Sequence, residues 1–151
     1  MRIIEESYVI FCKEPIVTIK LNGEWSVQKA MEFGDILLSE CEKQNWEKHI
    51  FITDLRHYII PGLNVSVLLN NSMKRLAVKT KLKYNALIVT PDFKDVIQMY
   101  FQYVHLKETG ITSKAFSGYS SALDWIQSMG FSINSDKKEE IVNFASKSTT
   151  I

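Results

Sequence analysis

Residues 50–63 have the sequence IFITDLRHYIIPGL, and this stretch decides the fold class. Residues 50–54 form a short apolar run that ends in a carboxylate, which is typical of an interior strand reaching the edge of a sheet. Residues with helical spacing follow Pro61-Gly62 and continue to about Thr80. A buried strand followed by a helix predicts a parallel sheet with helical crossovers, and it places Asp54 at the edge of that sheet.

The sequence upstream of this stretch predicts a hairpin and a helix. Residues 8–21 are rich in Val, Ile, Phe and Tyr and are interrupted by Lys13-Glu14-Pro15, which indicates two antiparallel strands around a tight turn. Ser26 can cap a helix that runs to about Gln44, because its hydroxyl can accept a hydrogen bond from a first-turn N–H group.

Two further strand–helix steps follow downstream. Residues 84–89 and 112–116 are expected to be strands. Thr90-Pro91-Asp92 has the chemistry of a helix start, and Ser117 is expected to cap a last helix that ends near Gly130. The inward stripe predicted for the helix after residue 90 consists of Phe93, Val96, Ile97, Tyr100, Phe101 and Val104.

The predicted order is ββαβαβαβα, an α/β fold with about four helices. Its mixed, mostly parallel sheet opens with an N-terminal β-hairpin and continues through right-handed crossovers. Residues 1–130 are predicted to be a single domain, and residues 131–151 a C-terminal tail. That tail is either disordered or a short amphipathic helix with the apolar residues Ile141, Val142, Phe144 and Ala145.

Composition narrows the classes of function. The formal net charge is +1, so no field of the whole molecule attracts nucleic acid or an anionic membrane. The longest apolar runs are too short for a membrane span or an export signal, which predicts a cytoplasmic protein. Cys12 and Cys41 have no metal-site or redox spacing, and both are expected to be reduced and structural.

The polar residues after the strand allow one catalytic hypothesis. Asp54 and His57 could form an acid–base pair, but no serine or cysteine nucleophile lies in residues 54–63. In the structural alternative, which we prefer, Asp54 pairs with Arg56 or caps a neighbouring backbone group, while His57 and Tyr58 are half-buried on a loop. We therefore predict no catalytic residues.

Cofactor motifs are missing from the sequence. The three histidines have no metal-ligand spacing, and neither a dinucleotide-binding nor a P-loop glycine pattern occurs. The basic residues Lys74, Arg75, Lys79, Lys81 and Lys83 are expected to form a solvated helix face. We predict no metal, no cofactor and no nucleic-acid partner.

The element order, the strand ending Phe51-Ile52-Thr53-Asp54-Leu55-Arg56 and the closing pattern Ala115-Phe116-Ser117 with Ala122-Leu123-Asp124-Trp125-Ile126 together resemble a STAS-like domain. The resemblance spans residues 8–130 and is to the STAS-like family related to anti-sigma-factor antagonists. In those antagonists a serine within an Asp-Ser-Ser-Gly-Leu stretch is phosphorylated. Gly62-Leu63 matches the end of that stretch, but Ile60-Pro61 stands where the serines would be. Ser66 is expected to be an ordinary helical serine.

The resemblance implies a regulatory interaction module that lacks the phosphoserine switch. Its implied contact surface consists of Arg56, His57, Tyr58, Ile60, Pro61, Gly62 and Leu63. The alternative is a small-molecule- or lipid-binding domain with a pocket between sheet and helices, which the aromatic-rich helix with Tyr100, Phe101 and Tyr103 would line. A protein partner is expected in the first case, and a homodimer formed through a strand edge or the tail stays open.

Overall fold

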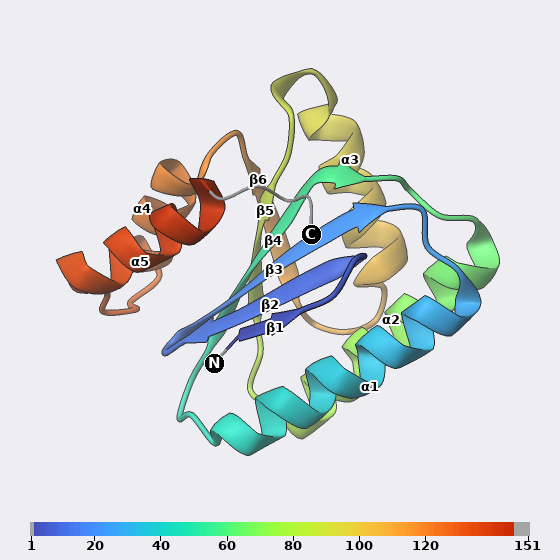
Figure 1. Cartoon of the computed structure of the whole chain (residues 1–151), viewed down its shortest axis with the longest axis horizontal. Coiled ribbons are helices and arrows are strands. Elements are labelled where there is room, and N and C mark those ends of the chain that lie inside the picture. Colours follow the sequence, from blue (N-terminus) through green and yellow to red (C-terminus); the bar gives the residue numbers. More distant parts are fainter. Residues whose placement is uncertain (1, 147–151) are drawn as a thin grey trace.

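The computed structural model describes residues 2–146 and confirms an α/β fold built on a six-stranded mixed sheet (Figure 1). The spatial order of the strands is their order in the sequence, from β1 at one edge to β6 at the other. The strands are β1 Arg2–Ile4, β2 Tyr8–Lys13, β3 Ile16–Gly23, β4 Ile50–Tyr58, β5 Tyr84–Ile88 and β6 Thr112–Phe116.

The N-terminal hairpin is confirmed as strands β2 and β3, which pair antiparallel on either side of Glu14-Pro15. From β3 to β6 every neighbouring pair is parallel. Strand β1 was not predicted; it pairs antiparallel with β2 and places Ile3 opposite Ile10. Three residues are too few to produce a periodic pattern in the sequence, so only pairing with β2 defines this strand.

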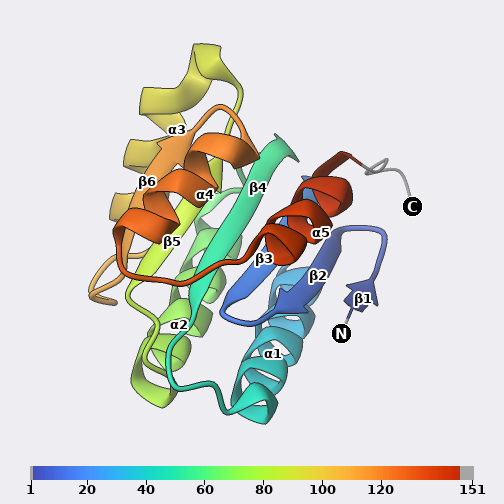
Figure 2. The ribbon, with the colours of Figure 1, turned by 90° about the vertical axis from the view of Figure 1, so that its left-hand side faces the viewer.

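Helices α1 (Val27–Gln44) and α2 (Leu63–Lys79) cover one face of the sheet (Figure 2). Each crossover moves one strand further in the same direction, and right-handed connections then place successive helices on the same side. The predicted start of α1 is confirmed, because the Ser26 hydroxyl accepts a hydrogen bond of 3.2 Å from the Lys29 N–H group.

Helices α4 (Tyr119–Ser128) and α5 (Ser135–Ser146) lie on the opposite face of the sheet (Figure 2). Residues 135–146 of the tail are therefore a docked helix, and the described chain has five α-helices where the sequence predicted about four. Helix α5 buries Ile141 and Phe144, and the buried Lys20 ammonium donates to the Phe144 carbonyl at 2.9 Å. Residues 147–151 lie outside the described part.

The predicted cap of α4 at Ser117 is wrong by one residue, because Gly118 occupies the N-cap position. Helix α4 begins at Tyr119, whose side chain is buried and whose hydroxyl donates to Asp54 on β4 at 2.9 Å. This hydrogen bond joins the first residue of α4 to a distant strand. A capping pattern in the local sequence carries no information about it.

The segment after Thr90 is less regular than predicted. It consists of a 3₁₀ turn (η1, Pro91–Phe93), helix α3 (Lys94–Tyr100) and a π-helix (η2, Phe101–His105). The predicted inward stripe is wrong at Phe93 and Val96, which are 60% and 64% exposed. Helix α3 lies beside β6 at the edge of the sheet, so only one side of it is covered (Figure 2).

Strand β4 is longer than predicted and ends at Tyr58 instead of Asp54. Asp54 is consequently inside the sheet, only 2% exposed, and not at its edge. His57 and Tyr58 are strand residues and not loop residues. The prediction ended the strand at Asp54 because a charged residue usually marks the end of a buried apolar run. In the structure the carboxylate is buried because it accepts hydrogen bonds from Arg56 and from Tyr119 on α4.

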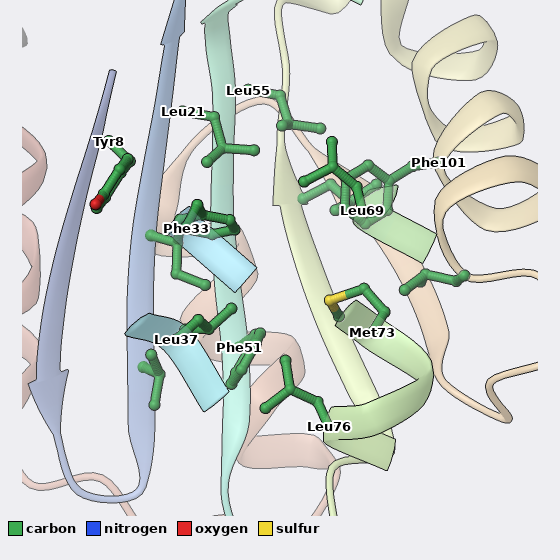
Figure 3. Close-up of a cluster of buried hydrophobic side chains, with 14 of the residues drawn as sticks. Tyr8, Leu21, Phe33, Leu37, Phe51, Leu55, Leu69, Met73, Leu76 and Phe101 are labelled. Atoms are coloured by element: carbon green, nitrogen blue, oxygen red, sulfur yellow. The ribbon is translucent and has the colours of Figure 1, made fainter. Parts of the chain in front are cut away.

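Two hydrophobic cores lie on the two faces of the sheet. The core under α1 and α2 contains Phe33, Leu37, Phe51, Leu69, Met73 and Leu76, which point toward one another in Figure 3. The core under α4 and α5 contains Ile52, Ile88, Phe116, Leu123, Ile126 and Phe144. None of the helices in residues 2–146 has the length and apolar character required to cross a bilayer.

Candidate functional site

The seven predicted contact residues lie on three successive parts of the chain. Arg56, His57 and Tyr58 belong to β4, Ile60 to Gly62 form the loop, and Leu63 is the first residue of α2. Arg56 reaches Asp54 on the α4 side of the sheet, whereas Tyr58 packs against Trp25 under the α1 side. His57, Ile60, Gly62 and Leu63 are exposed, whereas Arg56, Tyr58 and Pro61 are partly buried.

The Asp54 carboxylate accepts charge-assisted hydrogen bonds from two side chains. Arg56 Nε lies 3.0 Å from Oδ1 and Arg56 Nη2 lies 2.7 Å from Oδ2, while the Tyr119 hydroxyl donates to Oδ2 at 2.9 Å. The hydrogen bond to Asp54 raises the pKa of Arg56, and burial raises the pKa of Tyr119. The predicted pairing of Asp54 with Arg56 is therefore confirmed, and this cluster joins β4 to α4.

Large apolar side chains gather on the outside of α2 and α3. Leu63 and Val67 on α2 are 76% and 48% exposed, and Met99 and Tyr103 in the α3–η2 segment are 63% and 71% exposed. We define the α2–α3 face as Leu63, Val67, Val96, Met99 and Tyr103. Of these residues only Leu63 belongs to the contact surface predicted from the sequence.

Two shallow grooves connect the residues of the α2–α3 face. A groove of about 340 Å³ is lined by Leu63, Val67 and Tyr103, and a second of about 450 Å³ is lined by Val96, Met99 and Tyr103. Tyr103 and Val104 line both grooves and so connect α2 to α3. The first groove also has polar walls, which consist of Ser66, Asn70, Asn71, Lys74, Lys107 and Glu108. The sequence analysis missed this surface because it placed Val96 in the core and Tyr103 in a ligand pocket, whereas Val96 is 64% and Tyr103 71% exposed.

Tyr100 fixes α3 against the start of α2. Its hydroxyl contacts the Ser66 hydroxyl and lies 3.4 Å from the Pro61 carbonyl oxygen, to which it donates. Ser66 is 1% exposed, so α3 covers the serine closest in sequence to the position of the phosphoserine motif. The prediction that Ser66 is an ordinary helical serine is consistent with this burial.

A small cavity of about 30 Å³, lined by buried residues, lies between the sheet, α1, α2 and the π-helix η2. Its walls are mostly apolar, and several of the side chains that line it appear in Figure 3. The apolar lining includes Ile19, Leu21, Phe33, Leu37, Phe51, Leu69, Met73 and Phe101. The polar lining residues are Thr53, Ser72, Asn85 and His105.

Two buried polar atoms on residues that line this cavity have no hydrogen-bond partner among the described residues. The Thr53 hydroxyl donates to Asn85 Oδ1 at 2.8 Å, which leaves Asn85 Nδ2 unpaired. His105 Nε2 lies 3.1 Å from the Tyr58 hydroxyl, and His105 Nδ1 is unpaired. Burial lowers the pKa of His105 to about 4, so the ring is neutral near pH 7.

Which group donates between the Tyr58 hydroxyl and His105 Nε2 depends on the tautomer of the ring; when Tyr58 donates, the proton of the neutral ring is on Nδ1. Asn85 and His105 then both offer hydrogen-bond donors, and buried donors of this kind are nearly always satisfied by a partner. The sequence contains one signal for this site, since Asn85 is a polar residue inside an otherwise apolar strand. No sequence signal marks His105, which has no metal-ligand spacing with the other histidines.

No group of three His, Cys, Asp or Glu side chains in residues 2–146 could hold a metal ion. A scan against protein-family models and a search of curated proteins each found no match to the chain. The interpretation of the α2–α3 face and of the cavity therefore depends on the chain's own residues.

Proposed function

We propose that the chain is a non-catalytic, regulatory interaction module of STAS-like type, which binds a protein partner through the α2–α3 face. The observation that carries this proposal is the exposure of five large apolar side chains on two adjacent helices. Contiguous exposed apolar surface of this kind marks interaction sites in folded proteins.

The energetics favour burial of this face by a partner. Removing a Val or Leu side chain from water contributes about 1.5–3 kcal/mol, and aromatic and Met side chains are enriched at interface cores. Ile60, 37% exposed, extends the apolar surface into the loop that precedes α2. The predicted contact residues Ile60, Pro61, Gly62 and Leu63 thus contribute one margin of the proposed interface.

The proposed module works without a phosphoserine switch. Ile60-Pro61 precedes Gly62-Leu63 where the antagonists carry hydroxyl residues, and Ser66 is buried beneath Tyr100. A kinase could not reach the Ser66 hydroxyl without displacing α3.

The test is affinity capture from native extract with four baits: the wild type, Leu63→Glu, Tyr103→Glu and Val78→Glu. Val78 is the matched control, because it also lies on α2, is 83% exposed and is not part of the α2–α3 face. All three positions are exposed, so stability should change by less than about 0.5 kcal/mol. We expect the wild type and Val78→Glu to retain one common partner that Leu63→Glu and Tyr103→Glu lose.

The dissociation constant of the recovered partner, measured by calorimetry, should rise at least about tenfold for Leu63→Glu, since a buried carboxylate without a partner costs more than 1.4 kcal/mol. Equal affinity of all four proteins for every recovered partner would contradict the proposal.

The second candidate function is binding of a small ligand in this small cavity, and the unpaired atoms of Asn85 and His105 favour it. The fitting ligand has a hydrogen-bond acceptor and an apolar body. At about 30 Å³ the cavity has room for a water molecule, so a larger ligand requires α2 and η2 to move apart.

Native mass spectrometry of the purified protein separates the two candidates, because it records the subunit count and any co-purifying molecule together. An added small-molecule mass that disappears in Leu69→Trp, a variant that fills the cavity, would support ligand binding. An unmodified chain mass would contradict it and would leave the α2–α3 face as the functional surface.

A further inference from the structure

The outer edge of β6 is covered by a helical segment of the same chain. Strand β6 is last in the sheet and pairs on its inner side with β5. The backbone N–H and C=O groups along the outer side of an edge strand can pair with another chain unless something covers them. Helix α3 and the π-helix η2 lie beside this edge (Figure 2).

Two glutamines from the α3–η2 segment form hydrogen bonds with backbone groups of β6 that point away from β5. Gln98 Oε1 accepts a hydrogen bond of 2.8 Å from the Ala115 N–H group. Gln102 Oε1 accepts one of 2.7 Å from the Ser113 N–H group, and Gln102 Nε2 donates to the Ile111 carbonyl oxygen at 3.0 Å. Gln102 therefore offers both an acceptor and a donor, as the peptide group of a neighbouring strand would.

The spacing of the two glutamines matches the spacing of the strand. Gln98 is in α3 and Gln102, four residues later, is in the π-helix η2; at the rise of an α-helix four residues span about 6 Å along the axis. Ser113 and Ala115 are two residues apart on a strand, which corresponds to about 6.6 Å. Since Gln98 meets Ala115 and Gln102 meets Ser113, the helical segment runs opposite to β6 and meets alternate N–H groups of the strand.

We propose that Gln98 and Gln102 act together as a substitute for a seventh strand and close the β6 edge against pairing with β6 of a second copy of this chain. The α3–η2 segment thus covers the edge with its inner side while its outer side carries Val96, Met99 and Tyr103. This inference does not depend on the proposed partner-binding function, because it concerns the opposite side of the segment.

The first test measures amide hydrogen exchange by NMR in single variants, which keep one of the two glutamines. Gln98→Ala should speed exchange at the Ala115 amide about tenfold and leave Ser113 unchanged, and Gln102→Ala should do the reverse. Gln28→Ala is the matched control, because Gln28 is an exposed glutamine on α1. Unchanged protection of both amides in the two single variants would overturn the proposal.

The second test follows the mass of the double variant Gln98→Ala/Gln102→Ala with concentration by light scattering. We expect a twofold rise relative to the wild type, and we expect Ser113→Pro in the same background to reverse it. Proline removes the outward N–H group that strand pairing needs and is tolerated on the outer side of edge strands. A double variant with the wild-type mass throughout would overturn the proposal.

Discussion

The hydroxyl of Tyr58 lies 3.1 Å from Nε2 of His105, and this contact joins the end of β4 to the end of the π-helix η2. The same π-helix supplies Phe101 to the cavity and Tyr103 to the α2–α3 face. His105 itself also lines the cavity. Its burial also makes its protonation costly, which leads to a pH dependence that can be measured.

Stability should fall as the pH decreases from about 6.5 toward 4. Burial lowers the pKa of His105 in the folded chain to about 4, below the ordinary value of 6.5, so protons bind preferentially to the unfolded chain in this interval. The stabilisation is complete above pH 6.5, and up to about 3 kcal/mol is lost by pH 4. Burial lowers the pKa of His49 as well, which acts in the same direction.

Urea unfolding at a series of pH values checks this prediction. In His105→Gln the slope of unfolding free energy against pH between 6.5 and 4 should be smaller than in the wild type. His57→Gln is the control, because His57 is exposed, and its slope should match that of the wild type. Identical slopes for His105→Gln and the wild type would show that His105 does not carry the effect.

Replacing Tyr119 by Phe should destabilise the fold by about 1.5–3 kcal/mol, because it removes a hydrogen bond to the buried Asp54 carboxylate. The phenyl ring itself is kept, so the loss reports the hydroxyl alone. Tyr103→Phe removes a hydroxyl from an exposed ring and should change stability by less than about 0.5 kcal/mol. Equal midpoints of chemical denaturation for the two variants would contradict the assigned role of Tyr119.

Cys12 and Cys41 should not react with thiol reagents in the native protein. Both are buried, and burial raises the pKa of Cys12 to about 11 and that of Cys41 to about 12, so little reactive thiolate forms at pH 8. A chromogenic disulfide reagent should detect no thiol before denaturant is added and two afterwards. Rapid labelling of either cysteine in the folded chain would contradict this prediction.

Gly34→Ala should destabilise the protein by about 1–3 kcal/mol, although Ala is the better helix former. A Cβ atom at Gly34 would lie 2.1 Å from the Ser72 Oγ and 2.9 Å from its Cβ, where α1 packs on α2. Ser72→Ala removes the nearer atom and should recover part of the loss in the double variant. Additive effects of the two substitutions in a double-mutant cycle would show that the two residues do not interact.

The sequence correctly predicted those helices and strands whose local residue pattern favours the same structure that the packed fold requires. The hairpin around Glu14-Pro15, the helix capped by Ser26 and the parallel strand–helix steps are all confirmed. Each combines a turn or cap residue with an apolar pattern of the correct period, so short-range information was sufficient. The STAS-like resemblance and the function that it implies stay predictions.

The tertiary structure alone decided the length of β4, the exposure of Phe93 and Val96, and the positions of the two candidate sites. Asp54 can be buried because its carboxylate accepts hydrogen bonds from Arg56 and from Tyr119. Tyr119 is 65 residues away from Asp54 in the sequence. Helix α3 exposes apolar residues because it lies beside the edge of the sheet, where one of its sides has no neighbour in the described chain. By itself the sequence determined which residues are apolar enough to favour burial and where the chain turns. It did not determine which apolar and polar groups find partners, because those contacts form between segments that only the folded sheet brings together.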